Sequence, residues 1–103
     1  MVTEINSENI QSFVVSKSVT VLDCYATWCG PCKVLGETIE KLSETHSEVF
    51  FYKCDVEQNE DFVSTLNIRN LPTLIFYKDG KEVDRLFGSV PAERISDVLI
   101  KLM

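Results

Sequence analysis

Residues Leu22 to Lys33 read LDCYATWCGPCK, and this stretch holds three of the four cysteines of the chain. It continues the run VTVL, which is short and rich in branched side chains, as buried strands are. From about Cys32 a helical pattern begins, with an apolar face formed by Val34, Leu35, Ile39 and Leu42. The motif CGPC, residues 29–32, therefore stands where a strand gives way to a helix.

That position suits redox chemistry of cysteine. Free amide hydrogens and the dipole at a helix N-terminus stabilise a thiolate, which is the nucleophilic form of the thiol. Two intervening residues let Cys32 fold back and form a disulfide with Cys29, and Pro31 is compatible with a first helical turn. We expect Cys29 to attack a substrate disulfide and Cys32 to resolve the mixed disulfide.

Asp23 is a charged residue inside the apolar run, six positions before Cys29. Burial raises the pKa of a carboxyl group, so a buried Asp23 could accept the proton that Cys32 must lose, directly or through a water. The alternative is a structural aspartate that is hydrogen-bonded to neighbouring backbone amides.

Composition and charge limit the number of domains, the expected location and the kinds of partner. The chain has 103 residues, 45% of them hydrophobic and 25% charged, which predicts a single domain over residues 1–103. No apolar run is long enough to span a membrane, and the N-terminus resembles no signal peptide, so we expect a cytoplasmic protein. The net charge is −6 with interspersed signs, which disfavours nucleic acid as a partner.

The order of the expected elements gives the fold class. A first helix follows Ser7, with Ile10, Phe13 and Val14 on its apolar face, and a short strand at Val2–Ile5 precedes it. Further strands are expected in EVFFYKCDV, in PTLIFY and before Gly88, with an Asp-Gly hairpin turn in KDGK. Helices are expected near Asp61–Leu66 and over the face of Ile95, Val98, Leu99 and Leu102. This order predicts an α/β fold, a mixed sheet of about five strands flanked by four helices.

Several segments in the same order resemble the thioredoxin family over essentially the whole length. DCYATWCGPCK is similar to its redox signature, and KCDVEQN resembles the segment whose lysine, here Lys53, neighbours the buried aspartate. IRNLPTLIFYKDGK resembles the segment that carries a cis-proline, here Pro72. The resemblance departs at Tyr25, where tryptophan or phenylalanine is frequent, and at Glu37, where many members have a proline that kinks the helix.

The resemblance implies a thioredoxin fold and a protein-disulfide reductase. Cys29 would be the nucleophile, Cys32 the resolving cysteine and Asp23 a buried base tuned by Lys53. A flat surface for a substrate strand would be formed by Trp28, Gly30, Pro31, Leu71, Pro72 and Gly88. The chain would bind no cofactor of its own, and thioredoxin reductase would regenerate the dithiol with electrons from NADPH. Disulfide-containing proteins such as peroxiredoxins and ribonucleotide reductase would be its other partners, and the chain would act as a monomer.

The spacing of the cysteines also allows other interpretations. The spacing Cys24-x4-Cys29-x2-Cys32, with Cys54 further on, also matches a plant-type iron–sulfur pattern, but alternation along a strand puts Cys24 on the face opposite Asp23. A zinc site is disfavoured because His46 has no ligand spacing to the cysteines, and we expect it on the surface. Cys24 and Cys54 are expected to be small buried hydrophobes, with a second disulfide as the alternative. A disulfide isomerase or oxidase, or a redox-inactive binding module, could use the same fold.

Overall fold

The computed structural model describes residues 1–10, 13 and 18–103. Its strands are β1 (Val2–Glu4), β2 (Val19–Tyr25), β3 (Phe50–Asp55), β4 (Thr73–Lys78) and β5 (Lys81–Phe87). Its helices are α2 (Gly30–Thr45), α3 (Glu60–Ser64) and α4 (Ala92–Leu102). Of these described helices, none is both long and apolar enough to cross a membrane.

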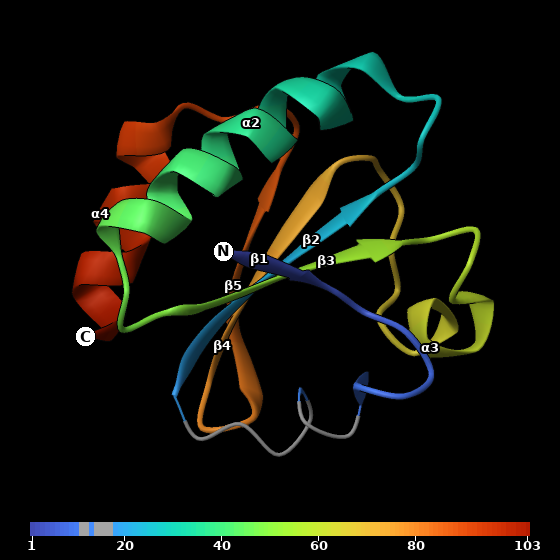
Figure 1. Cartoon of the computed structure of the whole chain (residues 1–103), viewed down its shortest axis with the longest axis horizontal. Coiled ribbons are helices and arrows are strands. Elements are labelled where there is room, and N and C mark those ends of the chain that lie inside the picture. Colours follow the sequence, from blue (N-terminus) through green and yellow to red (C-terminus); the bar gives the residue numbers. More distant parts are fainter. Residues whose placement is uncertain (11–12, 14–17) are drawn as a thin grey trace.

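The five strands form one mixed sheet in the order β1-β3-β2-β4-β5 (Figure 1). β3 runs parallel to both of its neighbours, β1 and β2, and α2 is the crossover that joins β2 to β3. β4 runs antiparallel to β2 and to β5, so the terminal hairpin adds an antiparallel edge. The mixed α/β sheet predicted from the sequence is confirmed.

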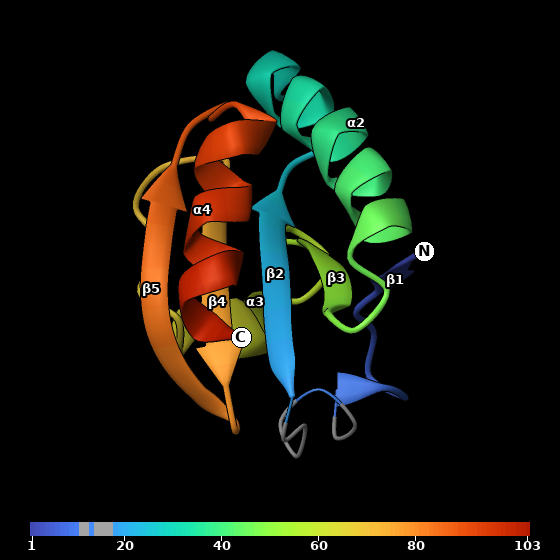
Figure 2. The same ribbon diagram turned by 90° about the vertical axis from the view of Figure 1, so that its left-hand side faces the viewer.

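Helices cover both faces of this sheet. Figure 2 shows α2 and α4 in front of the strands and α3 behind them. The α2/α4 face encloses the core of Val21, Leu35, Ile39, Phe51, Leu74, Phe76, Ile95 and Leu99. The opposite face encloses a second core that includes Ile5, Phe13, Leu22, Cys24, Cys54 and Ile75. Because successive side chains of β2 alternate between these faces, Asp23 and Cys24 point in opposite directions.

The N-terminal helix expected after Ser7 falls mainly on residues 11–12 and 14–17, Val14 among them, which lie outside the described residues. The structure therefore describes three of the four predicted helices. Within residues 1–10, which the structure describes, the side-chain oxygen of Asn6 accepts hydrogen bonds from the amides of Glu8 and Asn9 at 2.8 and 3.0 Å. These bonds close a turn over residues 7–9, and the capping role expected for Ser7 stays a prediction.

The β4–β5 hairpin has the predicted Asp-Gly turn. Asp79 and Gly80 have φ angles of 54° and 79°, the left-handed values that a tight type I′ turn demands at both central positions. A register shift between Phe76 and Tyr77 places Val83 in a bulge of the edge strand. The charged side chains of β5 and this bulge protect the edge of the sheet against pairing with other chains.

Candidate active site

The site begins where β2 leads into α2. Cys29 is the N-terminal cap of α2, and its Sγ accepts a hydrogen bond from the amide of Cys32 at 3.2 Å. Gly30 and Pro31 form the first helical positions, so the helix begins slightly before the expected Cys32, and Pro31 lies in the first turn as expected. One sulfur of the pair therefore lies directly at the positive end of a 16-residue helix, where negative charge is stabilised.

Cys29 and Cys32 form a disulfide, with their Cα atoms 5.2 Å apart. Their exposed fractions are only 6% and 4%, and they cluster with Ala26. Leu71 and Val56 pack against this cluster from two other loops. The structure thus presents the oxidised state of a redox pair in an apolar setting.

Asp23 is 2% exposed, and its Oδ1 has no hydrogen-bond partner in the part of the chain that the structure describes. Burial raises the pKa of its carboxyl group to about 7, while Lys53 lowers this pKa and Glu4 raises it. A structural aspartate satisfied by backbone amides would not leave this oxygen unpaired. The side chain is instead that of a carboxylic acid that can gain or lose a proton near neutral pH.

A cavity of about 330 Å³ connects this acid to the redox pair, because Asp23 and Cys32 both line it. Its other walls are Tyr25, Ala26, Thr27, Lys33, Gly36 and Lys53. A single water needs a small fraction of that space, roughly 30 Å³, so a water bridge between carboxyl and thiol fits.

Lys53 lies opposite Asp23 in the register of β2 and β3, as the sequence predicted. Its ammonium, however, is 3.8 Å from Oε1 of Glu4 on β1, and its side chain is 44% exposed. The Glu4 carboxylate also accepts the hydroxyl hydrogen of Tyr25, whose Oη is 2.9 and 3.0 Å from its two oxygens. Glu4 and the Tyr25 hydroxyl are members of the site that the sequence analysis missed.

The loop before β4 provides the opposite wall. The peptide bond between Leu71 and Pro72 is cis, and the Pro72 carbonyl accepts the amide of Gly88 at 2.9 Å. Gly88 has a φ angle of +81°, which favours glycine over residues with a side chain. The fold thus brings Gly88 next to Leu71 and Pro72, although it comes much later in the chain.

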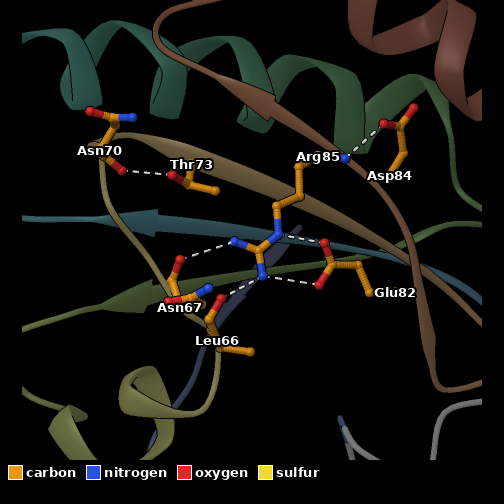
Figure 3. Close-up of polar contacts among 7 residues, drawn as sticks. All are labelled: Leu66, Asn67, Asn70, Thr73, Glu82, Asp84 and Arg85. Carbon is orange, nitrogen blue, oxygen red and sulfur yellow. Dashed lines mark hydrogen bonds and ion pairs between the residues drawn. The ribbon is translucent and has the colours of Figure 1, made fainter.

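Arg85 of β5 makes hydrogen bonds to the segment that leads into this loop (Figure 3). Its guanidinium donates to the carbonyl oxygens of Leu66 and Asn67, and Glu82 pairs with it through both carboxylate oxygens. Asn67 has a φ angle of 58°, a turn conformation that asparagine tolerates. Arg85 did not stand out in the sequence, because only the bulged hairpin brings it over the loop.

Trp28 completes the rim. It is 69% exposed, and its Nε1 donates to Oε2 of Glu57 at 3.0 Å. An exposed tryptophan directly before a reactive cysteine fits a contact surface rather than a core position. Glu57 is a further neighbour of the site that the sequence did not single out.

Comparison with known proteins agrees with this geometry. A family model described as thioredoxin matches residues 1–101. The chain belongs to the thioredoxin family. Thioredoxin-2 of Saccharomyces cerevisiae is 44% identical over 94 residues, which cover 89% of this chain and 90% of that protein.

Solved thioredoxin structures have the same fold. That of Malassezia sympodialis thioredoxin has a TM-score of 0.88 at 31% identity and covers 99% of this chain and 90% of its own. That of Fasciola hepatica thioredoxin has a TM-score of 0.88 at 30% identity, covering 98% and 99% of the two chains. The predicted thioredoxin fold is confirmed, and with its cysteine pair the chain is a thiol–disulfide oxidoreductase that reduces protein disulfides.

The other two cysteines have a different environment. Cys24 and Cys54 face each other in the register of β2 and β3, both are fully buried, and both are free thiols. Burial raises the pKa of each thiol, so both are held protonated. They lie on the face of the sheet opposite Asp23, and the described residues contain no cluster of three metal-binding side chains. The iron–sulfur and zinc interpretations have no support in this arrangement.

Proposed function

We propose that this chain transfers two electrons from the Cys29–Cys32 dithiol to a disulfide in another protein. In the first step the Cys29 thiolate attacks one substrate sulfur. The substrate S–S bond breaks, a mixed disulfide forms, and the departing substrate thiolate takes up a proton. The position of the Cys29 sulfur at the start of α2 supports its role as the attacking thiolate.

In the second step Cys32 loses its proton and attacks Cys29. The mixed disulfide breaks, the Cys29–Cys32 bond forms, and the second substrate sulfur leaves as a thiolate. The proton of Cys32 passes to Asp23, directly or through a water in the shared cavity. The observation that carries this proposal is that Asp23, whose buried Oδ1 has no hydrogen-bond partner within the described residues, lines the same cavity as Cys32.

The substrate meets the rim around the disulfide. We assign Trp28, Gly30, Pro31, Leu71, Pro72 and Gly88 to this contact surface. Its support is the exposure of Trp28 and the packing of Leu71 on the cysteine cluster. Pro72 has no amide hydrogen, so its side of the rim presents carbonyl and apolar groups to the approaching sulfur.

The cycle needs an electron source, because each turnover leaves the chain oxidised. Thioredoxin reductase supplies these electrons from NADPH in our proposal, and the chain itself binds no cofactor. Peroxiredoxins and ribonucleotide reductase are the disulfide-containing partners that we propose, with the chain acting as a monomer in the cytoplasm.

Two cysteine variants test the assignment of roles, with insulin as the disulfide substrate. Each variant is first reduced with dithiothreitol, which is removed before insulin is added because it would cleave a mixed disulfide. The Cys32→Ser variant is expected to accumulate a mixed disulfide through Cys29, which mass spectrometry detects. The Cys29→Ser variant is expected to form no such adduct and to reduce no insulin. If the adduct formed faster through Cys32 in the Cys29→Ser variant, the two roles would be reversed, and equal rates would contradict the assignment.

The reduction potential decides between a reductase and its alternatives on the same fold. Thioredoxin itself has a potential of about −270 mV, and we expect a value near it for this chain in a glutathione buffer, followed by Trp28 fluorescence. A value above about −200 mV would instead indicate an oxidase or isomerase.

A further inference from the structure

Three charged side chains lie in one row across the parallel part of the sheet. Glu4 of β1 is the register partner of Lys53 on β3, and Lys53 is the register partner of Asp23 on β2. Register partners on neighbouring strands point to the same face, so the order across the sheet is acid, amine, acid. Figure 1 shows the three strands side by side beneath α2.

The Lys53 ammonium does not pair equally with the two carboxyl groups. Lys53 Nζ is 3.8 Å from a Glu4 oxygen and makes this ion pair at a half-exposed position. Asp23 is buried, and its Oδ1 has no partner within the described residues. Two carboxylates thus compete for one ammonium, and in this structure the outer carboxylate holds it.

Tyr25 fixes the outer carboxylate in place. Its hydroxyl lies 2.9 and 3.0 Å from the two Glu4 oxygens, so the carboxylate is held between a phenol on β2 and an ammonium on β3. Tyr25 follows Asp23 by two positions on the same strand and therefore shares its face. A phenylalanine or tryptophan at this position could not make this hydrogen bond in the same way, since only tyrosine has a hydroxyl group.

We propose that Glu4, anchored by the Tyr25 hydroxyl, is a positioning residue for the proton transfer from Cys32. It holds the Lys53 ammonium and so leaves the Asp23 carboxyl group free to take up a proton. The inference rests on the proposed function, in which that carboxyl receives the Cys32 proton. The opposite effects of Lys53 and Glu4 on the pKa of Asp23 agree with it.

Other charged groups also face Asp23. From α2 these are Lys33, Glu37 and Glu40, which line the cavities beside it. All three side chains are exposed, so water screens them more strongly than it screens the row within the sheet. We therefore expect a single substitution to change the pKa of Asp23 most when it removes the charge of Glu4 or Lys53.

The titration of Asp23 tests the proposal directly. We would follow its side-chain carboxyl carbon by NMR in the oxidised protein, where Cys29 and Cys32 do not titrate, and assign the signal with Asp23→Asn. Glu4→Gln is expected to move the Asp23 midpoint to lower pH by at least about half a pH unit, because Lys53 is then free to pair with Asp23. Tyr25→Phe should move it the same way by less, since the unanchored carboxylate turns toward water.

The matched control is Glu44→Gln, which removes the same charge from an exposed position in the last turn of α2. We expect it to leave the midpoint unchanged. A midpoint that Glu4→Gln and Tyr25→Phe leave at the wild-type value would overturn the proposal.

A kinetic measurement separates this inference from the function on which it rests. Reduction of DTNB releases one thionitrobenzoate on attack by Cys29 and a second on resolution by Cys32. In the wild type the low-pH limb of the resolution rate is expected to follow the Asp23 midpoint, and Glu4→Gln should displace both together. If Glu4→Gln moves the midpoint but not the limb, the role of Asp23 as proton acceptor is wrong. If Asp23→Asn abolishes the limb while Glu4→Gln moves nothing, only the role of Glu4 is wrong.

Discussion

At the scale of single residues, Asp23 departs furthest from ordinary core chemistry. Its pKa is raised from 3.8 to about 7 by burial, so between these pH values the folded protein binds a proton that the unfolded chain releases. Stability associated with this group is complete below the unfolded pKa and is lost as the pH rises through the folded one. Above neutral pH the ionised Asp23 lowers the free energy of unfolding by on the order of 4 kcal/mol.

The Asp23→Asn variant should therefore be more stable than the wild type by an amount that grows with pH. We expect a gain of a few kcal/mol at about pH 8 and a smaller gain at about pH 5, measured by urea unfolding of the oxidised proteins. Asp97→Asn, at an exposed site of α4, is the control and should change stability little at either pH. A gain that did not depend on pH would contradict the raised pKa.

The site residues that were predicted from the sequence are of types that are unusual at their positions. A cysteine pair at a strand–helix junction and a charge inside an apolar strand stand out in one dimension. Glu4 and Arg85 do not, because each looks like an ordinary exposed charge until strand pairing gives it a partner. Glu4 requires the parallel register of β1 with β3, and Arg85 requires the bulge in β5.

At the scale of elements, the loop before β4 depends on the neighbouring strand β5. Arg85 binds the carbonyl oxygens of Leu66 and Asn67, and the Thr73 hydroxyl donates to the Asn70 carbonyl at 2.6 Å (Figure 3). The loop thus has hydrogen bonds at both ends before it reaches the cis-proline. Since a guanidinium presents several donors in one plane, it can hold two carbonyls and a carboxylate at once.

Replacing Arg85 should loosen that loop. Arg85→Ala is expected to lower the free energy of unfolding by about 2 kcal/mol, because charge-assisted hydrogen bonds to two carbonyls are lost. Arg85→Lys should recover only part of this loss. Urea unfolding gives the stability, and hydrogen exchange of the amides of residues 66–71 gives the local effect. Arg94→Ala, on the exposed face of α4, is the control; equal losses in both variants would mean that Arg85 does not clamp the loop.

Most element boundaries followed from local signals. The Asp-Gly turn, the strand before CGPC and the amphipathic face of α4 were each predicted from a few neighbouring residues, and the structure places them there. The start of α2 at Gly30 was expected at about Cys32, because the apolar pattern of this helix begins only after the CGPC motif.

At the scale of the whole molecule, acidic residues outnumber basic ones by 16 to 10, giving a net charge of −6. Glu57 places part of this charge beside Trp28 at the rim of the redox pair. Negative potential near the site should attract cationic disulfides and repel anionic ones, at distances within about a Debye length of 10 Å. The chain should therefore select weakly among substrates by their charge.

Two small disulfides of opposite charge test this selection. We expect cystamine to be reduced about 3- to 10-fold faster than dithiodiglycolate at low salt, after each rate is divided by that with dithiothreitol, because the acidic rim favours the cation. The ratio should fall toward one as ionic strength exceeds about 0.15 M. Glu57→Gln should lower the low-salt ratio more than Glu44→Gln, which removes the same charge at the far end of α2. If both variants lowered it equally, the selection would come from net charge alone; a ratio that salt left unchanged would exclude electrostatic selection altogether.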